Sequence, residues 1–402
     1  MRNIIDSIKY IGVNDNDIDL FEGQYIVPNG MTYNSYIILG EKIALMDTVD
    51  KSKTNEWISN LEELLDGREP DYLVVSHLEP DHAGSIAEVL NKYKNMKIVL
   101  NPIAQRMYSQ FFNIDVSDRT ELVKDGDILD LGEYKLTFLT ASMVHWPEVM
   151  FSYEEKTKTL FSADGFGKFG ACNIEDELVY NFTGFNQINW AEKWDDEARR
   201  YYINICGKYG AQVQAVLKKI SKLNLDIKSI CPLHGPILTG DLSHYLGLYD
   251  KWSKYEPEEN GTLIVYGSIH GNTMQVANKL YEAIKLQGSK VEIMDIARCD
   301  IPEAIAKAYK YGKLVIASVT YNMSIFPNMY LFVNLLKEKN YQNRKVGIIE
   351  NGSWAPNTEN VIKNILENQK DIEFLKPTIS IKSKISEENE KEIVDLAKEL
   401  VK

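Results

Sequence analysis

The sequence predicts an α/β protein with two domains, in which a sheet sandwich flanked by helices precedes a doubly wound parallel sheet. Three observations lead to this prediction. The chain has 402 residues, which is too long for one ordinary core. In the second half, short apolar strands alternate with helical patterns. In the first half, strand-like runs come early and in close succession, with fewer helices between them.

The second half alternates strands and helices in regular order. Apolar runs predict five strands, at residues 263–266, 290–296, 314–319, 345–349 and 373–381. Helical spacing of apolar residues predicts five helices, at residues 273–287, 302–311, 328–339, 358–369 and 387–401. Gly288 follows the first helix, where glycine commonly ends a helix. This alternation predicts a five-stranded parallel sheet with helices on both faces.

The first half mixes hairpins with helices. Strand-like runs lie at residues 24–27, 36–39, 43–47, 72–75, 97–100, 135–140, 149–153, 159–163 and 229–231. Helices are predicted at residues 55–65 and 242–252. The polar segment Lys254–Gly261, broken by Pro and Gly, is the predicted linker. We therefore expect one domain at residues 1–256 and a second at 257–402.

Composition and charge exclude several classes of protein. The chain is 44% hydrophobic and 26% charged, as soluble globular proteins are. The sequence has no apolar run near the roughly 20 residues of a membrane span, and acidic residues near the N-terminus do not fit a signal peptide. A net charge of −13 argues against nucleic acid as a partner. Four cysteines without a C-x-x-C pair predict neither a disulfide framework nor a zinc ribbon, and favour the reducing cytoplasm.

Histidines and acidic residues gather where predicted strands end. Only six histidines occur in the chain, and four of them follow strands. A single histidine after a strand is more often solvated or hydrogen-bonded than a ligand, but four in one context are hard to reach by chance. His244 falls within a predicted helix and is not expected to bind metal. Candidate ligands at the strand ends are His77, Glu79, Asp81, His82, His145, Asp164 and His234.

The chemistry of these ligands narrows the choice of metal. Four imidazoles and three carboxylates are too many for one tetrahedral zinc ion, which takes four ligands. They suit two metal ions that share a carboxylate, and Asp164 is the natural bridge. Because the set contains nitrogen and oxygen but no thiolate, it favours iron or manganese over structural zinc.

The order His77-x-Glu79-x-Asp81-His82 resembles the metallo-β-lactamase superfamily, whose hydrolytic members usually carry H-x-H-x-D-H and bind zinc. Glu79 replaces the second histidine here, which is the mark of the flavodiiron proteins. That resemblance covers nearly the whole chain, because this family joins an αββα metallo-β-lactamase-like sandwich to a flavodoxin-like domain. It implies the following ligands: His77, Glu79 and His145 for one iron, Asp81, His82 and His234 for the other, and Asp164 as the bridge. The role of His82 stays open, because some family members leave this imidazole off the metal.

Three loops of the second half resemble the FMN site of flavodoxins. The first follows a strand and opens a helix, where hydroxyls and free backbone N–H groups bind phosphate; it consists of Ser268, Ile269, His270, Gly271, Asn272 and Thr273. His270 departs from the usual pattern, which has a hydroxyl residue there. The other two loops follow the third and fourth strands and consist of Ser318, Val319, Thr320, Tyr321, Asn322 and Met323, and of Asn351, Gly352, Ser353 and Trp354. Tyr321 and Trp354 are candidates to flank the flavin ring. No G-x-G-x-x-G fingerprint indicates a nicotinamide site.

The resemblance implies an oxidoreductase with FMN and two non-haem iron ions. It would reduce dioxygen to water, nitric oxide to nitrous oxide, or both, with electrons relayed through FMN from an external donor such as rubredoxin. A head-to-tail homodimer, or a dimer of such dimers, would bring the flavin of one subunit to the irons of the other. Two alternatives remain: a zinc-dependent hydrolase with an appended flavodoxin domain, and an electron carrier whose first domain only docks partners.

Overall fold

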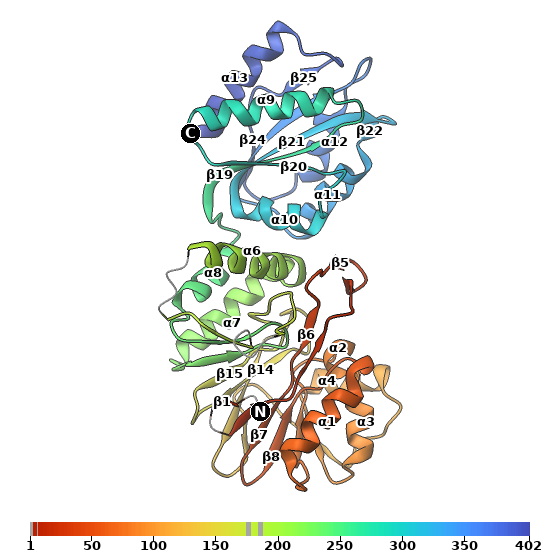
Figure 1. Cartoon of the computed structure of the whole chain (residues 1–402), viewed down its shortest axis with the longest axis vertical. Helices are drawn as coiled ribbons and strands as arrows, with labels where there is room; N and C mark the ends of the chain where they lie inside the picture. The colour runs from red at the N-terminus through yellow and green to blue at the C-terminus, as the bar shows by residue number, and fades with distance from the viewer. Residues whose placement is uncertain (1–2, 6, 174–177, 184–187) are drawn as a thin grey trace. The chain divides into compact units, whose positions relative to one another are not determined.

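The computed structural model of the chain describes residues 3–5, 7–173, 178–183 and 188–402 (Figure 1). The chain divides into two compact units. The first comprises Met1–Tyr202 and Ala211–Gly247, and the second comprises Ile203–Gly210 and Leu248–Lys402. The predicted boundary between residues 256 and 257 stays a prediction.

The first unit contains two seven-stranded sheets. The first sheet has the order β1-β2-β7-β8-β9-β10-β11. Its strands are β1 (Asn3–Ile5), β2 (Ile8–Tyr10), β7 (Tyr36–Leu39), β8 (Ile43–Met46), β9 (Tyr72–Val74), β10 (Lys97–Leu100) and β11 (Thr120–Leu122). Strands β8 to β11 run parallel to one another. Apolar residues fill β7, β8 and β9 almost continuously because these strands are covered on both faces.

The second sheet has the order β12-β13-β14-β15-β17-β18-β16. Its strands are β12 (Ile128–Asp130), β13 (Lys135–Thr140), β14 (Met150–Glu154), β15 (Thr159–Phe161), β17 (Ser229–Cys231), β18 (Ile237–Thr239) and β16 (Val179–Asn181). Two small ribbons stand outside both sheets, β3 (Val13–Asp15) with β6 (Met31–Tyr33), and β4 (Leu20–Phe21) with β5 (Tyr25–Ile26).

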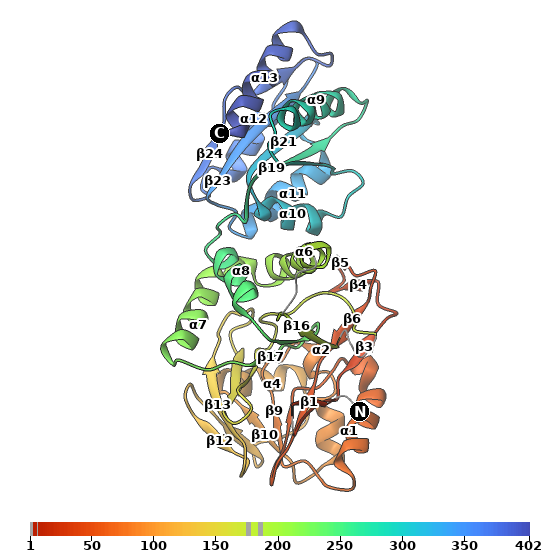
Figure 2. The same cartoon turned by 60° about the vertical axis from the view of Figure 1, so that its left-hand side comes forward.

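The two sheets face each other across a common apolar core. Tyr36, Val74 and Val99 of the first sheet pack with Phe138 and Phe161 of the second. Figure 1 shows α1 (Thr54–Leu65), α3 (Ile86–Lys92) and α4 (Pro102–Phe111) beside the first sheet and α7 (Gly210–Lys222) beside the second, and Figure 2 keeps α1 and α7 on opposite sides. The unit is therefore the predicted αββα sandwich. Among the described residues, this unit also contains η1 (Lys51–Lys53), α2 (Pro80–Ala83), most of α6 (Ile188–Ile205) and the first half of α8 (Ser243–Ser253), whereas η2 (Gly207–Tyr209) belongs to the second unit.

The second unit is built on a parallel sheet with the order β20-β19-β21-β23-β24. Its strands are β19 (Glu259–Gly267), β20 (Val291–Asp295), β21 (Tyr311–Tyr321), β23 (Arg344–Asn351) and β24 (Ile372–Phe374), with β22 (Ser324–Ile325) and β25 (Ile379–Ile381) paired to β21 and β23. Helices α9 (Asn272–Leu286) and α13 (Glu387–Val401) pack on one face, and α10 (Ile301–Lys310), α11 (Pro327–Glu338) and α12 (Thr358–Leu366) cover the other. The predicted five-stranded, doubly wound sheet is confirmed.

Three predicted elements differ from the structure. The last three residues of the predicted linker, 259–261, already belong to β19. The predicted strand at residues 373–381 is two strands, β24 and β25, because Pro377 lies between them and cannot donate a ladder hydrogen bond. The predicted loop after the third strand is partly strand, since β21 continues to Tyr321 and turns into β22 through Asn322 and Met323, whose φ angles are 50° and 62°.

Candidate metal centre and flavin-binding loops

The predicted ligands of the first unit meet because their strands point the same way. Strands β8 and β9 are parallel neighbours, as are β15 and β17. Strand β13 runs in the direction of β15, since each is antiparallel to the intervening β14. His77 follows β9, His145 follows β13, Asp164 follows β15 and His234 follows β17. The carboxyl ends of these strands thus deliver side chains from both sheets to one edge of the sandwich.

The structure brings all seven predicted ligands together in two groups. One contains His77, Glu79, His145 and Asp164, and the other contains Asp81, His82 and His234. Within each group, the possible ligand atoms lie within 4.8 Å of one another. In the first group, Glu79 Oε2 lies 3.1 Å from Nε2 of both His77 and His145. In the second, Asp81 Oδ2 lies 3.1 Å from His234 Nε2 and 3.3 Å from His82 Nε2.

Asp164 lies between the two groups and turns one oxygen toward each. Its Oδ2 is 3.0 Å from His145 Nε2 and 3.6 Å from His77 Nε2. Its Oδ1 is 3.0 Å from His82 Nε2 and 3.9 Å from His234 Nε2. Ligand atoms at right angles about an ion, each about 2.1 Å away, lie roughly 3 Å apart. The spacings are therefore those of two neighbouring coordination shells that share one carboxylate.

The Nδ1 contacts of two imidazoles direct their Nε2 atoms toward the cluster. His77 Nδ1 lies 2.8 Å from Glu148 Oε1, and His234 Nδ1 lies 2.7 Å from the carbonyl of Thr32. Because a carboxylate and a carbonyl only accept, each Nδ1 carries a proton. In the neutral form of each ring, Nε2 then carries a lone pair that faces carboxylate oxygens, so either a second proton or a metal ion must lie between these atoms.

Buried atoms without hydrogen bonds lead to the same conclusion. Several buried atoms of the cluster have no hydrogen-bond partner among the described residues, although most of them lie within ion-pair distance of one another. They are both carboxylate oxygens of Asp81, both ring nitrogens of His82, Asp164 Oδ1 and His234 Nε2. Leaving such groups unsatisfied is costly. The residues present thus fit two metal ions, with His82 inside the second group.

In the absence of metal, the cluster shifts its own ionisation. Burial alone would lower the pKa of His145, but hydrogen bonds with Asp164 and Glu79 raise it to about 9. Burial is likewise outweighed at His77, whose pKa lies well above its ordinary value because of Glu148 and Glu79. Burial would raise the pKa of Asp164, but the neighbouring imidazoles hold it well below its ordinary value. Imidazolium–carboxylate pairs thus substitute for the ions.

The loop Ser76–Gly84 is shaped by its proline and glycine. Pro80 occupies the first turn of α2, and Glu79 is the residue just before that helix. A Cβ at Gly84 would lie 2.5 Å from the carbonyl oxygen of Pro80 and 2.6 Å from the backbone nitrogen of Lys51. No side chain fits there, which allows the loop to fold back tightly enough to present four possible ligands.

Several residues outside the predicted set hold the ligands in place. Asp47 Oδ1 accepts from the backbone N–H groups of Ser76 and His77, at 2.7 and 3.3 Å. Asn34 Nδ2 donates to the carbonyls of Pro232 and Gly235, on either side of His234, at 2.8 Å each. Asp47 could have been found from the sequence, because it follows a strand as Asp164 does. Asn34 gave no such signal, since its partners lie about 200 residues away.

Glu22 is a further acidic residue close to the cluster. It lies in the turn between β4 and β5, next to Phe21, whose ring centroid is 5.1 Å from that of His234. The side chain of Glu22 is exposed, but desolvation by the neighbouring protein raises its pKa to about 7, and the negative charges of Glu79, Asp164 and Asp81 add to this effect. His244, in contrast, is paired with Asp195 at 3.0 Å on the surface, away from both groups.

In the second unit, the three predicted flavin loops lie at one edge of the sheet. Strands β19, β21 and β23 are adjacent and parallel, so their carboxyl ends meet there. Asn351 joins two of the loops, because its Nδ2 donates to Thr273 Oγ1 at 3.2 Å. Asn357 N donates to Thr320 Oγ1 at 2.9 Å and thereby ties the second loop to the segment after the third.

The first loop has the properties of a phosphate site. Gly271 precedes α9 with a φ of 87°, and no side chain caps the helix. A Cβ on Gly271 would have only one neighbour within 4 Å, the Met274 methyl at 3.9 Å, so the loop is open. Ser268 Oγ accepts from Gly271 N at 3.1 Å, and His270 is exposed. Free N–H groups at a helix N-terminus suit phosphate.

Aromatic and apolar side chains surround this loop without being covered. Trp354 is 89% exposed, Met323 62%, Ile269 46% and Tyr321 44%. Large apolar groups rarely gather in the open without a ligand or partner. The three loops therefore fit a planar apolar ring joined to a phosphate, as in FMN.

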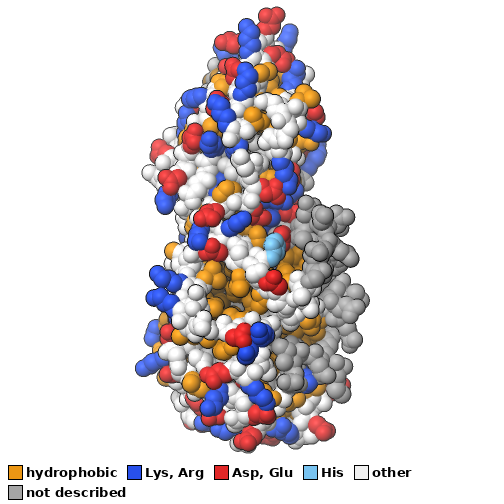
Figure 3. Space-filling model, turned by 90° about the vertical axis from the view of Figure 1, so that its left-hand side faces the viewer, with side chains coloured by type: hydrophobic (Ala, Val, Ile, Leu, Met, Phe, Trp, Pro, Cys, Tyr) orange, Lys and Arg blue, Asp and Glu red, His pale blue; other side chains and the backbone are white. Residues whose placement is uncertain are grey.

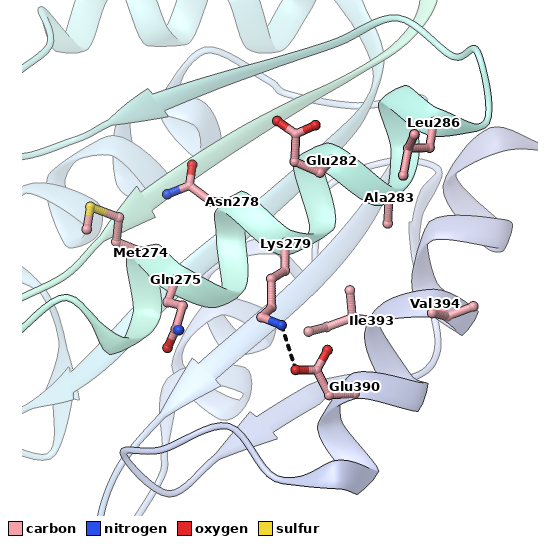
Figure 4. Close-up of a pocket in the computed structure, with 10 residues that line it drawn as sticks. All are labelled: Met274, Gln275, Asn278, Lys279, Glu282, Ala283, Leu286, Glu390, Ile393 and Val394. Atoms are coloured by element: carbon pink, nitrogen blue, oxygen red, sulfur yellow. Dashed lines mark hydrogen bonds and ion pairs between the residues drawn. The ribbon is translucent and has the colours of Figure 1, made fainter.

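Other surface features contain none of the predicted site residues. A groove of about 530 Å³ lies between α9 and α13, where Lys279 and Glu390 form an ion pair next to Ile393 (Figure 4). On the face drawn in Figure 3, Lys and Arg side chains are interspersed with Asp and Glu. Within the described ranges, no helix is long and apolar enough to cross a membrane.

Known families match both units. Residues 31–235 match the family described as ODP family beta lactamase, and residues 264–367 match the flavodoxin family. The first match contains every predicted metal ligand. The second contains all three predicted flavin loops.

Relatives and solved structures combine these two parts. The chain is 28% identical over 361 residues to the anaerobic nitric oxide reductase flavorubredoxin of Pectobacterium atrosepticum, covering 88% of this chain and 68% of the relative. It is 30% identical over 326 residues to the nitric oxide reductase of Moorella thermoacetica, covering 81% and 79%.

Among solved structures, rubredoxin oxygen:oxidoreductase from Desulfovibrio gigas superposes with a TM-score of 0.89 at 27% identity, covering 98% of this chain and 96% of that one. A flavo di-iron protein mutant from Thermotoga maritima gives a TM-score of 0.87 at 25% identity, covering 100% and 97%. Because both family matches occur in this order and these relatives and structures match most of the chain, the chain belongs to the flavodiiron proteins.

Proposed function

We propose that this protein is a flavodiiron oxidoreductase that reduces dioxygen to water, nitric oxide to nitrous oxide, or both. Electrons would be relayed through FMN from an external donor to a non-haem diiron centre. The observation that carries the proposal is the position of Asp164, which directs one carboxylate oxygen to each of two ligand groups.

The seven clustered residues are proposed to hold two iron ions. His77, Glu79 and His145 would bind one ion, and Asp81, His82 and His234 the other, with Asp164 bridging them. Such a set of nitrogen and oxygen ligands without thiolate suits iron. When bound, the two ions and the flavin supply the electrons and the open coordination positions that reduction of a diatomic gas requires.

Aromatic side chains pack against the histidines of the cluster. The Trp146 ring stands at 90° to that of His77, with their centroids 5.1 Å apart. In the second ligand group, the ring of Phe21 makes a similar edge-on contact with the ring of His234. These rings provide an apolar lining that suits a small neutral gas better than a charged or bulky hydrolase substrate. Glu22 is the nearby acid placed to hold a proton close to this site.

The loop residues of the second unit are proposed to bind FMN. The backbone of residues 268–273 and the hydroxyls of Ser268 and Thr273 would hold the phosphate. Residues 318–323 and 351–354 would hold the ring, with Tyr321 and Trp354 against it. Their open, apolar surroundings support this assignment.

The names of two similar proteins support the substrates and the donor. The Moorella thermoacetica relative is a nitric oxide reductase, and the Desulfovibrio gigas protein is a rubredoxin oxygen:oxidoreductase. A rubredoxin-type protein is the proposed electron donor here. We further propose a head-to-tail homodimer, or a dimer of such dimers, in the cytoplasm, with domains at residues 1–256 and 257–402. Sedimentation analysis that finds an active monomer would exclude the dimer.

Paired assays test the proposed function. The purified protein should contain two iron ions and one FMN per chain. Under anaerobic conditions it should reduce nitric oxide with a common reductant and donor, and in a matched assay dioxygen, and the ratio of the two efficiencies gives its preference. Asp164→Asn should abolish both activities while FMN stays bound. Two zinc ions together with hydrolytic activity would overturn the proposal in favour of a hydrolase, and gas reduction unaffected by Asp164→Asn would favour a simple electron carrier.

A further inference from the structure

Glu148 is a buried carboxylate that contacts a candidate metal ligand without belonging to either ligand group. It is 1% exposed, and its Oε1 lies 2.8 Å from His77 Nδ1, on the side of the ring away from the cluster. The same oxygen accepts from the backbone N–H of Leu78 at 3.0 Å. Glu148 thus fixes both the ring of His77 and the backbone that follows it.

The position of Glu148 is itself fixed from the neighbouring helix. Asn101 caps α4, since its Oδ1 accepts from the N–H groups of Ile103 and Ala104. Its Nδ2 donates to the backbone carbonyl of Glu148. Glu148 Oε2 is buried without a hydrogen-bond partner in the described part of the chain. A buried carboxylate that keeps one oxygen unsatisfied is costly to maintain, which indicates that its charge has a use.

The two ligand groups are matched in their inner residues. Each offers two imidazoles, one carboxylate of its own and one oxygen of Asp164. The two groups differ in the acceptors that are hydrogen-bonded to the Nδ1 atoms of their imidazoles. His77 has the carboxylate of Glu148, whereas His234 has only the neutral carbonyl of Thr32. His82 Nδ1 is buried with no hydrogen-bond partner among the described residues.

From this asymmetry we infer that Glu148 is a positioning residue that makes the two metal positions inequivalent, strengthening His77 as a ligand and favouring the ion of the first group. The inference rests on the proposed function, because it assumes that the two groups bind metal.

The physical reason is the charge behind the ring. A carboxylate hydrogen-bonded to Nδ1–H makes the imidazole a stronger electron donor at Nε2 and fixes its orientation. The additional negative charge also favours a cation in the first group over one in the second, through a medium of low dielectric. A carbonyl fixes the ring orientation but brings no net charge. The first group should therefore bind metal more tightly, although the inner ligands are the same.

The variant Glu148→Gln removes the negative charge of the side chain but keeps its size and one accepting oxygen. The glutamine oxygen can still accept from His77 Nδ1–H and Leu78 N–H, so the loop keeps its hydrogen bonds while the charge is lost. The matched control is Glu154→Gln. Glu154 is also fully buried and also accepts from backbone N–H groups, those of Lys156 and Thr157, but it contacts none of the candidate ligands.

The experiment is an anaerobic titration of the metal-free full-length chain with ferrous ion against a competing chelator. We expect the wild type to bind two ions with unequal affinity. In Glu148→Gln the tighter ion should bind about tenfold more weakly, within the usual range for loss of such a partner, while the weaker ion changes little. Glu154→Gln should match the wild type. Glu148→Ala, which also loses the orientation, should weaken the tighter ion by up to about a hundredfold.

Mössbauer spectra of protein loaded with isotopically enriched iron provide a readout that a purely structural role would not change. The wild type should give two different iron signals, and Glu148→Gln should shift one and leave the other. If both ions weaken equally, or if Glu148→Gln behaves like Glu154→Gln, the inference is overturned while the proposed function stands. If the wild type binds no pair of ions, the proposed function fails and this inference fails with it.

Discussion

Loading the metal-free protein with ferrous iron should release protons. In the metal-free cluster, imidazolium groups pair with Glu79 and Asp164. A metal ion needs the Nε2 lone pair of each imidazole, so the proton there must leave. Proton release therefore tests whether the histidines are ligands, independently of any catalytic activity.

The pKa of His145 determines how many protons are released when iron binds. It is about 9 in the metal-free protein, so at about pH 7.5 roughly 97% of this imidazole is protonated. His145 alone should release about one proton per chain. His77 and His234, whose pKa values are also raised, bring the upper limit to about three. The ion displaces a proton from His145 only if that imidazole is protonated. The number of protons released by His145 should therefore fall to about one half near pH 9.

The release can be measured by calorimetry in two buffers with different ionisation enthalpies, or with an indicator dye in weak buffer. His145→Ala should lower the release by about one proton at pH near 7.5. The matched control is His244→Ala, which removes a surface histidine outside the cluster and should change nothing. Saturation with two ions without proton release, or equal release by His145→Ala and the wild type, would refute the reasoning.

Three further predictions concern stability and ionisation. Burial raises the pKa of Asp47 to about 6, so its contribution to the folding free energy is complete below about pH 3.8 and is lost as the pH rises through 6. Asp47→Asn should therefore stabilise the metal-free protein by up to about 3 kcal/mol at neutral pH, measured by urea unfolding, and by little at pH below about 4; a destabilised variant at neutral pH would contradict this. A glutamate carboxyl that titrates near pH 7 by NMR should be missing in Glu22→Gln, and its midpoint should fall when iron is bound. Gly84→Ala should cost about 1–3 kcal/mol in unfolding experiments and weaken iron binding, since a Cβ meets the backbone of Pro80, and wild-type values for both would exclude a tight loop.

The second half of the fold could be predicted in detail because its signals are local. The predicted helix at residues 387–401 has the bounds of α13, which begins with a capping box between Ser386 and Asn389. The incorrect predictions concern segments whose secondary structure is determined by tertiary contacts. Residues 259–261 look like a polar linker, but they extend β19 beside β21, as the pairing of Glu259 with Tyr311 shows. Polar residues can join a strand when a neighbouring strand offers its edge.

The candidate ligands could be predicted because strand ends place residues in a common context whatever the rest of the fold. The residues that hold these ligands in place could not be predicted from the sequence. Glu148 lies three residues after His145 in the sequence, but its carboxylate is hydrogen-bonded to His77, which is 71 residues away. A carboxylate near a histidine in sequence gives no sign of which imidazole it will meet, because that depends on how the two sheets are stacked. Glu22 was missed for the same reason, since a two-strand ribbon carries it to the cluster.

The hydrogen bond from His234 to Thr32 spans 202 residues, and this has a consequence for synthesis. Contacts between distant parts of a chain form late, because both partners must first leave the ribosome. All residues of the first ligand group exist once Asp164 has been made, whereas the second group waits for His234, and its holder Thr32 is among the earliest residues made. During translation the two metal positions are therefore completed in sequence. A chain paused between these points would have all residues of the first coordination shell but not those of the second, so both metal positions can be filled only after this domain is complete.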